Sequence, residues 1–134
     1  MTSSLLYVSR RLASPADVAD ILRVSQSRNA GLGITGALVA SSQHFAQVLE
    51  GRRAAIDELM TSITNDARHA HVRVIFYRDT AGRAFHDWTM AYAGEIGFVD
   101  RQIAPLMEES PHPQDGVHVR RLMELMRELV QSAT

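Results

Sequence analysis

A glutamine within a predicted apolar strand is the first candidate for a functional residue. Strand alternation in "HFAQVLEG" (44–51) puts Phe45, Gln47 and Leu49 on one face and Ala46 and Val48 on the other, and these two rows are apolar except at Gln47. A primary amide buried among such neighbours costs about 2–7 kcal/mol unless its two donors and its acceptor find partners. Gln47 therefore needs a bonding partner inside the fold.

Tyr7 and Asn29 are two further polar residues in or beside predicted apolar elements. If Tyr7 and Gln47 lie on adjacent strands and share the face that helices cover, the phenol and the amide can bond each other and any ligand between the helices. Residue chemistry alone leaves open whether Tyr7 and Gln47 only satisfy each other's hydrogen bonds or also bind a ligand. Asn29, just past the predicted helix end, suits either a left-handed C-cap or a ligand contact.

The histidines and the segment "DARH" (66–69) are the remaining candidates for a binding site. No histidine pair has helical i, i+4 spacing with a third ligand nearby, and His69 and His71 are two apart at a strand entry, so we expect no metal site. Arg68 and His69 follow a predicted helix and can meet a phosphate, but for this segment taken alone a solvated helix end is the commoner explanation.

Composition narrows the class of protein. The 134 residues suit one compact domain, and 14 basic against 15 acidic side chains leave a net charge of -1, which gives no case for nucleic acid or an anionic membrane as partner. The absence of cysteine excludes disulfides, thiolate catalysis and the usual zinc and iron–sulfur sites. Without a signal peptide or a run of about 18 apolar residues, we expect a soluble cytoplasmic protein.

Hydrophobic periodicity predicts the elements that must position these residues. Strands are expected at 4–9, 33–40, 44–50, 72–78 and 88–93. One helix is expected within 14–29, ending just before Asn29, and a second at 54–66. Ser14 is the expected N-cap, with Pro15 at the first helical position and Asp17 completing a capping box. The order β-α-β-β-α-β-β favours an α+β, ferredoxin-like sheet with both helices on one face.

A C-terminal segment is the expected cover for the other face of the sheet. Residues 116–131 carry an apolar helical stripe formed by Val119, Leu122, Met123, Met126, Leu129 and Val130. Residues 98–109 form a second helical segment that Pro105 interrupts. We therefore divide the chain into a domain at 1–95 and a helical extension at 96–134 that belongs to the same compact unit.

Several strings occur together in the order of one known family. "NAGLGITGALVASSQHFAQVLEG" (29–51) follows "LLYVSR" (5–10) and precedes "DARH" (66–69) and "RAFHDWTMAY" (83–92). Over about residues 4–93 the chain resembles the BLUF family, blue-light sensors that use flavin. The resemblance implies a flavin, usually FAD with FMN as the alternative, held noncovalently with its ring between the two helices.

The resemblance also implies roles for individual residues. Those in contact with the flavin ring are Tyr7, Asn29 and Gln47. Apolar walls are supplied by Ile21, Leu22 and Ile63. Further cofactor contacts are expected from Arg28 and, at the mouth of the pocket, from Asp66, Arg68 and His69. Signal output is associated with Trp88 and Met90.

As the family mechanism is described, the excited flavin takes an electron and a proton from Tyr7 and returns them, leaving the Gln47 amide rotated or tautomerised. No substrate is turned over. The tail of about 40 residues is too short for a catalytic domain. We therefore expect a short stand-alone photoreceptor, not an enzyme, that signals through protein–protein contact, either as a homo-oligomer or with an unknown downstream partner.

Two other functions compete with this interpretation. A light-independent interaction module would use the ferredoxin-like sheet as a docking surface, and a colourless purified protein would favour it. A small acylphosphatase-like enzyme would need a glycine-rich phosphate cradle after the first strand, where "SRRLASP" (9–15) stands instead.

Overall fold

The structure is a computed structural model of the chain. It describes residues 2–85, 91–95, 99–108 and 115–132, and of residues 91–95, 115 and 129–132 it describes the backbone alone. Within these ranges, the elements follow the order β-α-β-β-α-β up to residue 80, a fifth strand spans residues 91–95, and helices dominate after residue 99.

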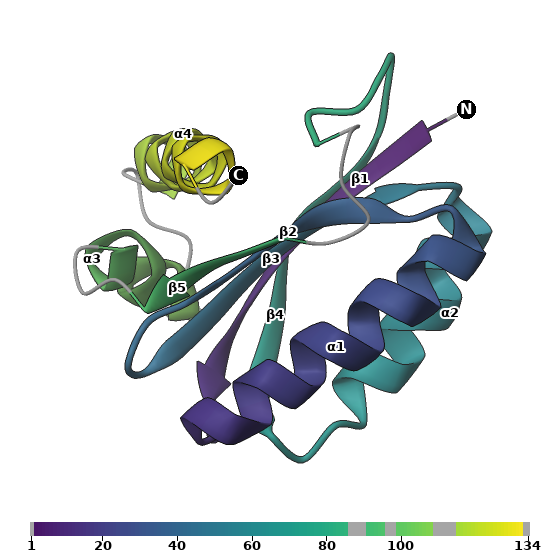
Figure 1. Cartoon of the computed structure of the whole chain (residues 1–134). Helices are drawn as coiled ribbons and strands as arrows, with labels where there is room; N and C mark the ends of the chain where they lie inside the picture. The colour runs from purple at the N-terminus through teal and green to yellow at the C-terminus, as the bar shows by residue number, and fades with distance from the viewer. Residues whose placement is uncertain (1, 86–90, 96–98, 109–114, 133–134) are drawn as a thin grey trace.

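Five strands form one mixed sheet in the order β4-β1-β3-β2-β5, with β2 and β5 parallel and the other neighbours antiparallel. The strands are β1 (Thr2–Arg11), β2 (Thr35–Ala40), β3 (His44–Gly51), β4 (His69–Thr80) and β5 (Ala91–Glu95). The helices are α1 (Pro15–Leu32), α2 (Arg53–Thr64), α3 (Asp100–Ile103), the 3₁₀ turn η2 (Ala104–Met107) and α4 (Asp115–Ser132). Helices α1 and α2 cover one face and α3 and α4 the other (Figure 1), which confirms the predicted α+β arrangement.

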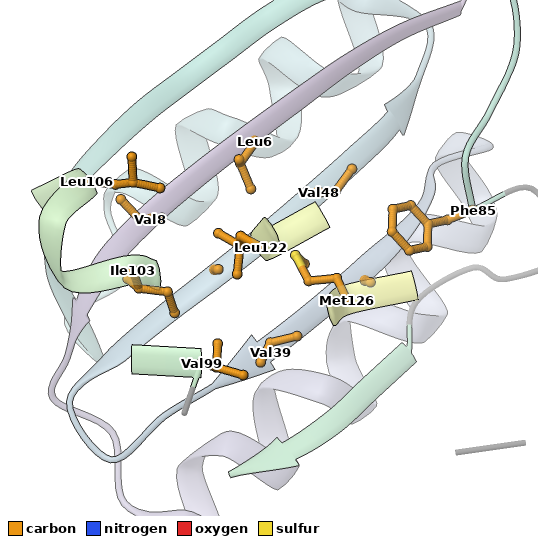
Figure 2. Close-up of a cluster of buried hydrophobic side chains, with 12 residues drawn as sticks. Leu6, Val8, Val39, Val48, Phe85, Val99, Ile103, Leu106, Leu122 and Met126 are labelled. Atoms are coloured by element: carbon orange, nitrogen blue, oxygen red, sulfur yellow. The ribbon is translucent and has the colours of Figure 1, made fainter. Parts of the chain in front are cut away.

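Strand alternation divides the core into two clusters. On β1, Leu5 and Tyr7 face α1 and α2, whereas Leu6 and Val8 belong to the opposite cluster. Figure 2 shows that opposite cluster, in which strand residues meet Leu122 and other side chains of the C-terminal helices. The alternation of side chains along each strand therefore decides which residues point toward α1 and α2.

Helix α1 begins as the sequence predicts and ends later. The Ser14 hydroxyl accepts a hydrogen bond from the Asp17 N–H at 3.2 Å, and the Asp17 carboxylate accepts one from the Ser14 N–H at 3.1 Å, so the capping box is present. The C-cap is Gly33, whose φ of 67° is the left-handed conformation that glycine adopts without steric cost. The placement of Asn29 beyond the helix, and its C-cap interpretation, are therefore wrong, because Asn29 lies inside α1.

The C-terminal segment covers the face of the sheet that α1 and α2 leave open. Leu122 and Met126 of α4 are buried among strand residues, and Val119 and Met123 pack against them. The Leu129 and Val130 side chains lie outside the described residues. Pro105 falls in the 3₁₀ turn η2, directly after the short helix α3 ends at Ile103.

The last two strands differ from the predicted ranges. β4 extends to residues 69–80, longer than the expected 72–78, and includes His71 at a φ of 55°. β5 begins at Ala91, and residues 86–90 of the expected strand lie outside the described residues. Apolar periodicity marks the buried centre of a strand, so the polar ends of β4 carried no such pattern.

We expect Gly36→Ala to destabilise the protein strongly. A methyl group at this position in β2 would lie 1.9 Å from the backbone oxygen of Val48 in the paired strand β3, and backbone has little room to move. The expected loss is about 3 kcal/mol or more in the free energy of unfolding, measured by urea denaturation. Gly31→Ala is the matched control, since nothing lies within 4 Å of its added methyl. An equal unfolding midpoint in the two variants would contradict the argument.

Candidate functional site

A cavity lies between α1, α2 and the sheet. Its floor comes from the strands, through Tyr7, Leu38, Phe45 and Gln47. One wall comes from α1, through Ile21, Val24, Ser25 and Arg28. The other side comes from the end of α2 and the segment after it, through Ser62, Ile63, Asp66, Arg68 and His69. Eight of the ten cofactor contacts predicted from the sequence therefore line one cavity, and the two that do not are Leu22 and Asn29.

Tyr7 and Gln47 form a hydrogen-bonded pair on the cavity floor. They lie directly opposite each other on the antiparallel strands β1 and β3, and the Tyr7 hydroxyl donates to Gln47 Oε1. Each residue is 4% exposed. Because opposite residues on one sheet face have side chains within reach of each other, the register of the two strands alone brings phenol and amide together.

The surroundings of Tyr7 keep its phenol protonated. Burial raises the pKa of Tyr7 well above its usual value, the negative charge of Asp66 adds to the rise, and the positive charge of Arg28 opposes it. The hydroxyl thus remains a donor to Gln47 through the neutral and mildly alkaline range. An electron can leave this phenol only if its proton has somewhere to go, and Gln47 Oε1 is already in contact with it.

Asn29 carries a buried amide that the described protein does not satisfy. The residue is 1% exposed, and neither its Oδ1 nor its Nδ2 bonds any described residue. It lies one turn beyond Ser25 on α1, so the two share the helix face that lines the cavity. Since buried amides in native proteins nearly always have partners, these two atoms indicate a ligand or ordered water beside Asn29.

At the mouth of the cavity, Arg68 is held by two carboxylates. Its guanidinium donates to Asp66 at 2.7 Å and to Asp20 of α1 at 3.1 Å. These hydrogen bonds lower the pKa of Asp66 and raise the pKa of Arg68. Arg28, in contrast, makes no hydrogen bond or ion pair within the described part of the chain. Of these two cavity-lining arginines, Arg28 is the one whose donors are available.

His69 lies in the wall of the cavity with both ring nitrogens engaged. Nε2 lies 2.6 Å from the Ile63 carbonyl oxygen, which can only accept, so Nε2 carries the proton. Nδ1 lies 2.8 Å from the Ser9 hydroxyl, and the ring edge meets Tyr7 and Phe45. His69 therefore ties the end of α2 to β1, and its nitrogens are not free for a phosphate.

Five lining residues escaped the sequence prediction: Val24, Ser25, Leu38, Phe45 and Ser62. Two of them had a usable pattern. Phe45 shares the strand face of Gln47, and Ser25 follows Ile21 by four positions on the same helix face. The remaining predicted pair, Trp88 and Met90, lies outside the described residues.

Two negative findings hold for the described ranges. No group of three histidine, cysteine, aspartate or glutamate side chains is arranged there to hold a metal ion. No helix in the same ranges combines the length and the apolar character that crossing a bilayer requires.

Comparison with known proteins finds similar sequences and similar solved structures. The chain is 34% identical over 90 residues to the photoactivated adenylate cyclase subunit beta of Euglena gracilis, covering 64% of this chain and 10% of that protein. It thus spans about a tenth of the length of the curated relatives it matches. The solved dark-state structure of the BLUF protein BlrB is 36% identical, with a TM-score of 0.72 over 91% of this chain and 94% of that one. The photo-activated state of BlsA, at 21% identity and a TM-score of 0.75, shares the fold.

The chemistry of the cavity fits a flavin. An isoalloxazine ring is flat and apolar with one polar edge, and the cavity offers aliphatic walls from Ile21 and Ile63 beside the buried amide of Gln47. The unsatisfied amide of Asn29 lies one helical turn beyond the cavity-lining Ser25. The family model described as BLUF, sensors of blue light using FAD, matches residues 2–91. With this match over two thirds of its length, the chain belongs to the BLUF family of flavin-binding blue-light sensors.

Proposed function

We propose that light acts on this protein through the hydrogen bond between Tyr7 and Gln47. The observation that carries the proposal is the buried donation from the Tyr7 hydroxyl to Gln47 Oε1 on the floor of the cavity. When bound, a flavin supplies absorption of blue light and, in its excited state, an acceptor for one electron and one proton.

The two side chains have complementary roles in this proposal. Tyr7 holds a proton at its hydroxyl and presents it to Gln47 Oε1. The Gln47 amide both donates and accepts, so two hydrogen-bond patterns of similar energy can exist in one cavity. A change from one pattern to the other turns over no substrate.

Binding of the cofactor is assigned to the residues around this pair. Ile21, Leu22 and Ile63 would hold the ring, and Asn29 would satisfy its amide at the ring's polar edge. Arg28 would meet a phosphate, with Asp66, Arg68 and His69 shaping the mouth. We propose FAD as the cellular cofactor, because the family description names it.

Arg28→Ala should weaken flavin binding more than Arg68→Ala does. Arg28 has unengaged donors beside the cavity, whereas Arg68 would have to leave Asp66 and Asp20 to reach a phosphate. Loss of a charge-assisted hydrogen bond corresponds to roughly a tenfold or greater rise in Kd. Titration of the stripped protein with FAD and with riboflavin, followed by flavin fluorescence, measures this. A larger loss in the Arg68 variant, or an equal loss for phosphate-free riboflavin, would contradict the assignment.

We further propose that the protein has no catalytic activity and signals by protein–protein contact. In this view residues 1–95 form the flavin-binding domain, and residues 96–134 form an extension through which a second copy or a downstream partner reads the light state. The position of α4 on the sheet face opposite the cavity supports this division, because a change in the sheet can reach the extension directly. Roles for Trp88 and Met90 in output remain part of the proposal.

An absorption measurement tests the proposed function. Protein purified in darkness should contain flavin, and blue light should shift the flavin bands slightly to the red, with the shift relaxing in darkness. A flavin-saturated preparation without a reversible shift would overturn the proposal. A protein that binds no flavin would instead favour the light-independent interaction module.

A further inference from the structure

Glu50 is a buried carboxylate that the proposed photochemistry does not use. It is 2% exposed and lies three residues after Gln47 on β3, so it points to the opposite face of the sheet from the cavity. Its Oε1 accepts hydrogen bonds from the Ala84 N–H at 2.7 Å and the Phe85 N–H at 2.9 Å. Within the described residues no cation forms an ion pair with this carboxylate, and the hydrogen bonds that it accepts there come from these two backbone amides.

The segment that Glu50 holds is also fastened by its other neighbours. Arg83 Nη1 donates to Thr35 Oγ1 at 2.9 Å and to the Glu50 carbonyl oxygen at 3.1 Å. Phe85 is 3% exposed and packs in the same buried cluster as Val48 and Met126 of α4 (Figure 2). Residues 83–85 therefore connect the end of β3 with the cluster on which α4 rests.

We propose that Glu50 is a positioning residue that couples the photoactive strand to the C-terminal helix. Its carboxylate fixes the backbone of residues 84–85 to β3, and Phe85 carries that position into the cluster beneath α4. A shift of β3 at Gln47 then reaches α4 through Glu50 and Phe85. This inference rests on the proposed function, since it needs light to act on Gln47.

The chemistry of the bond supports a positioning role. A buried carboxylate is costly unless its oxygens are bonded, and an apolar side chain would fill the same space at lower cost. Hydrogen bonds to a charged acceptor are short, strong and directional, so they transmit a small displacement where apolar contacts would slide. Two donors from consecutive residues on one oxygen fix the direction of the segment as well as its distance.

A pair of substitutions separates hydrogen bonding from packing. Glu50→Gln keeps an amide oxygen that can accept both bonds, whereas Glu50→Met keeps a similar volume without that oxygen. Glu58→Gln, on the exposed face of α2, controls for the loss of one negative charge. Hydrogen exchange of the flavin-saturated full chain is measured in darkness and under blue light, with the absorption shift recorded on the same sample.

We expect the red shift in all three variants. In Glu50→Met the dark exchange of the Ala84 and Phe85 amides should rise roughly tenfold or more, because each loses a bond to a charged group. The light-induced change in protection over residues 117–128 should disappear in that variant and persist in Glu50→Gln and Glu58→Gln. The inference would be overturned if this light-induced change persisted in Glu50→Met, or if the unsubstituted protein showed no such change. In either case a reversible red shift would still support the proposed function.

A second variant covers the case in which Glu50→Met fails to fold. Phe85→Leu keeps both backbone hydrogen bonds to Glu50 and shortens the side chain that enters the cluster. It should keep the red shift and reduce the light-induced change over residues 117–128. A light-induced change over residues 117–128 as large in Phe85→Leu as in the unsubstituted protein would also overturn the inference.

Discussion

Replacing Tyr7 with phenylalanine is expected to leave flavin bound and to abolish the light-induced red shift of its absorption bands. Phenylalanine keeps the buried ring and its edge contact with His69, so the cavity floor keeps its shape. It removes the hydroxyl that donates to Gln47 Oε1, and with it the proton that must leave with an electron. Loss of this buried hydrogen bond should lower the free energy of unfolding by about 1–3 kcal/mol, too little to unfold a typical domain.

Tyr77→Phe is the matched control for this experiment. Tyr77 bonds Asp57 and the Arg53 carbonyl oxygen at the surface and does not line the cavity. Its loss should therefore leave the shift and its dark relaxation unchanged. Absorption spectra before and after illumination decide the matter: a Tyr7→Phe protein with a normal reversible shift would show that the phenol is not needed.

Gln47→Leu should have the second large effect. Leucine is close to glutamine in volume but has neither donor nor acceptor, so the amide that can adopt two bonding patterns is gone. We expect flavin to remain bound and the red shift to be absent. The Tyr7 hydroxyl would also lose its buried acceptor, which should destabilise the fold by about 1–3 kcal/mol.

Two comparisons sharpen the Gln47 result. Gln43→Leu removes an exposed amide in the β2–β3 turn and should change nothing in the spectrum. Gln47→Glu keeps an acceptor for Tyr7 but loses the amide donors when ionised, so it should retain flavin and lose the normal shift. If Gln47→Leu loses flavin altogether while Gln47→Glu behaves as the unsubstituted protein, the amide has a structural role alone.

Much of the fold was predictable because local signals agree with each other. Ser14, Pro15 and Asp17 mark the start of α1 through capping chemistry that needs no tertiary information. Alternation in β1 and β3 predicted the face that Tyr7 and Gln47 share. The antiparallel pairing of these two strands, which α1 and β2 separate along the chain, then places the two residues opposite each other. The helical stripe of α4 identified Leu122 and Met126 as residues that pack on the open sheet face.

What the sequence missed depends on contacts between distant segments. Asn29 looked like a helix end because asparagine suits a cap, but Gly33 takes the left-handed position more easily, so the helix continues to it. His69 looked available to a phosphate until the fold placed Ile63 and Ser9 against its two nitrogens. Glu50 is the last residue of the strand predicted at 44–50, and no local pattern could show that its carboxylate accepts hydrogen bonds from the backbone of Ala84 and Phe85.

The most direct test of the account is a light-minus-dark infrared difference spectrum of protein labelled with ¹³C at the glutamine side-chain amide. The account predicts difference bands in the amide carbonyl region that shift with the label, because light changes the bonding of Gln47 Oε1. These bands should be absent in labelled Gln47→Leu and present in labelled Gln43→Leu. A reversible flavin red shift without any label-sensitive band would contradict the claim that light acts through the Tyr7–Gln47 hydrogen bond.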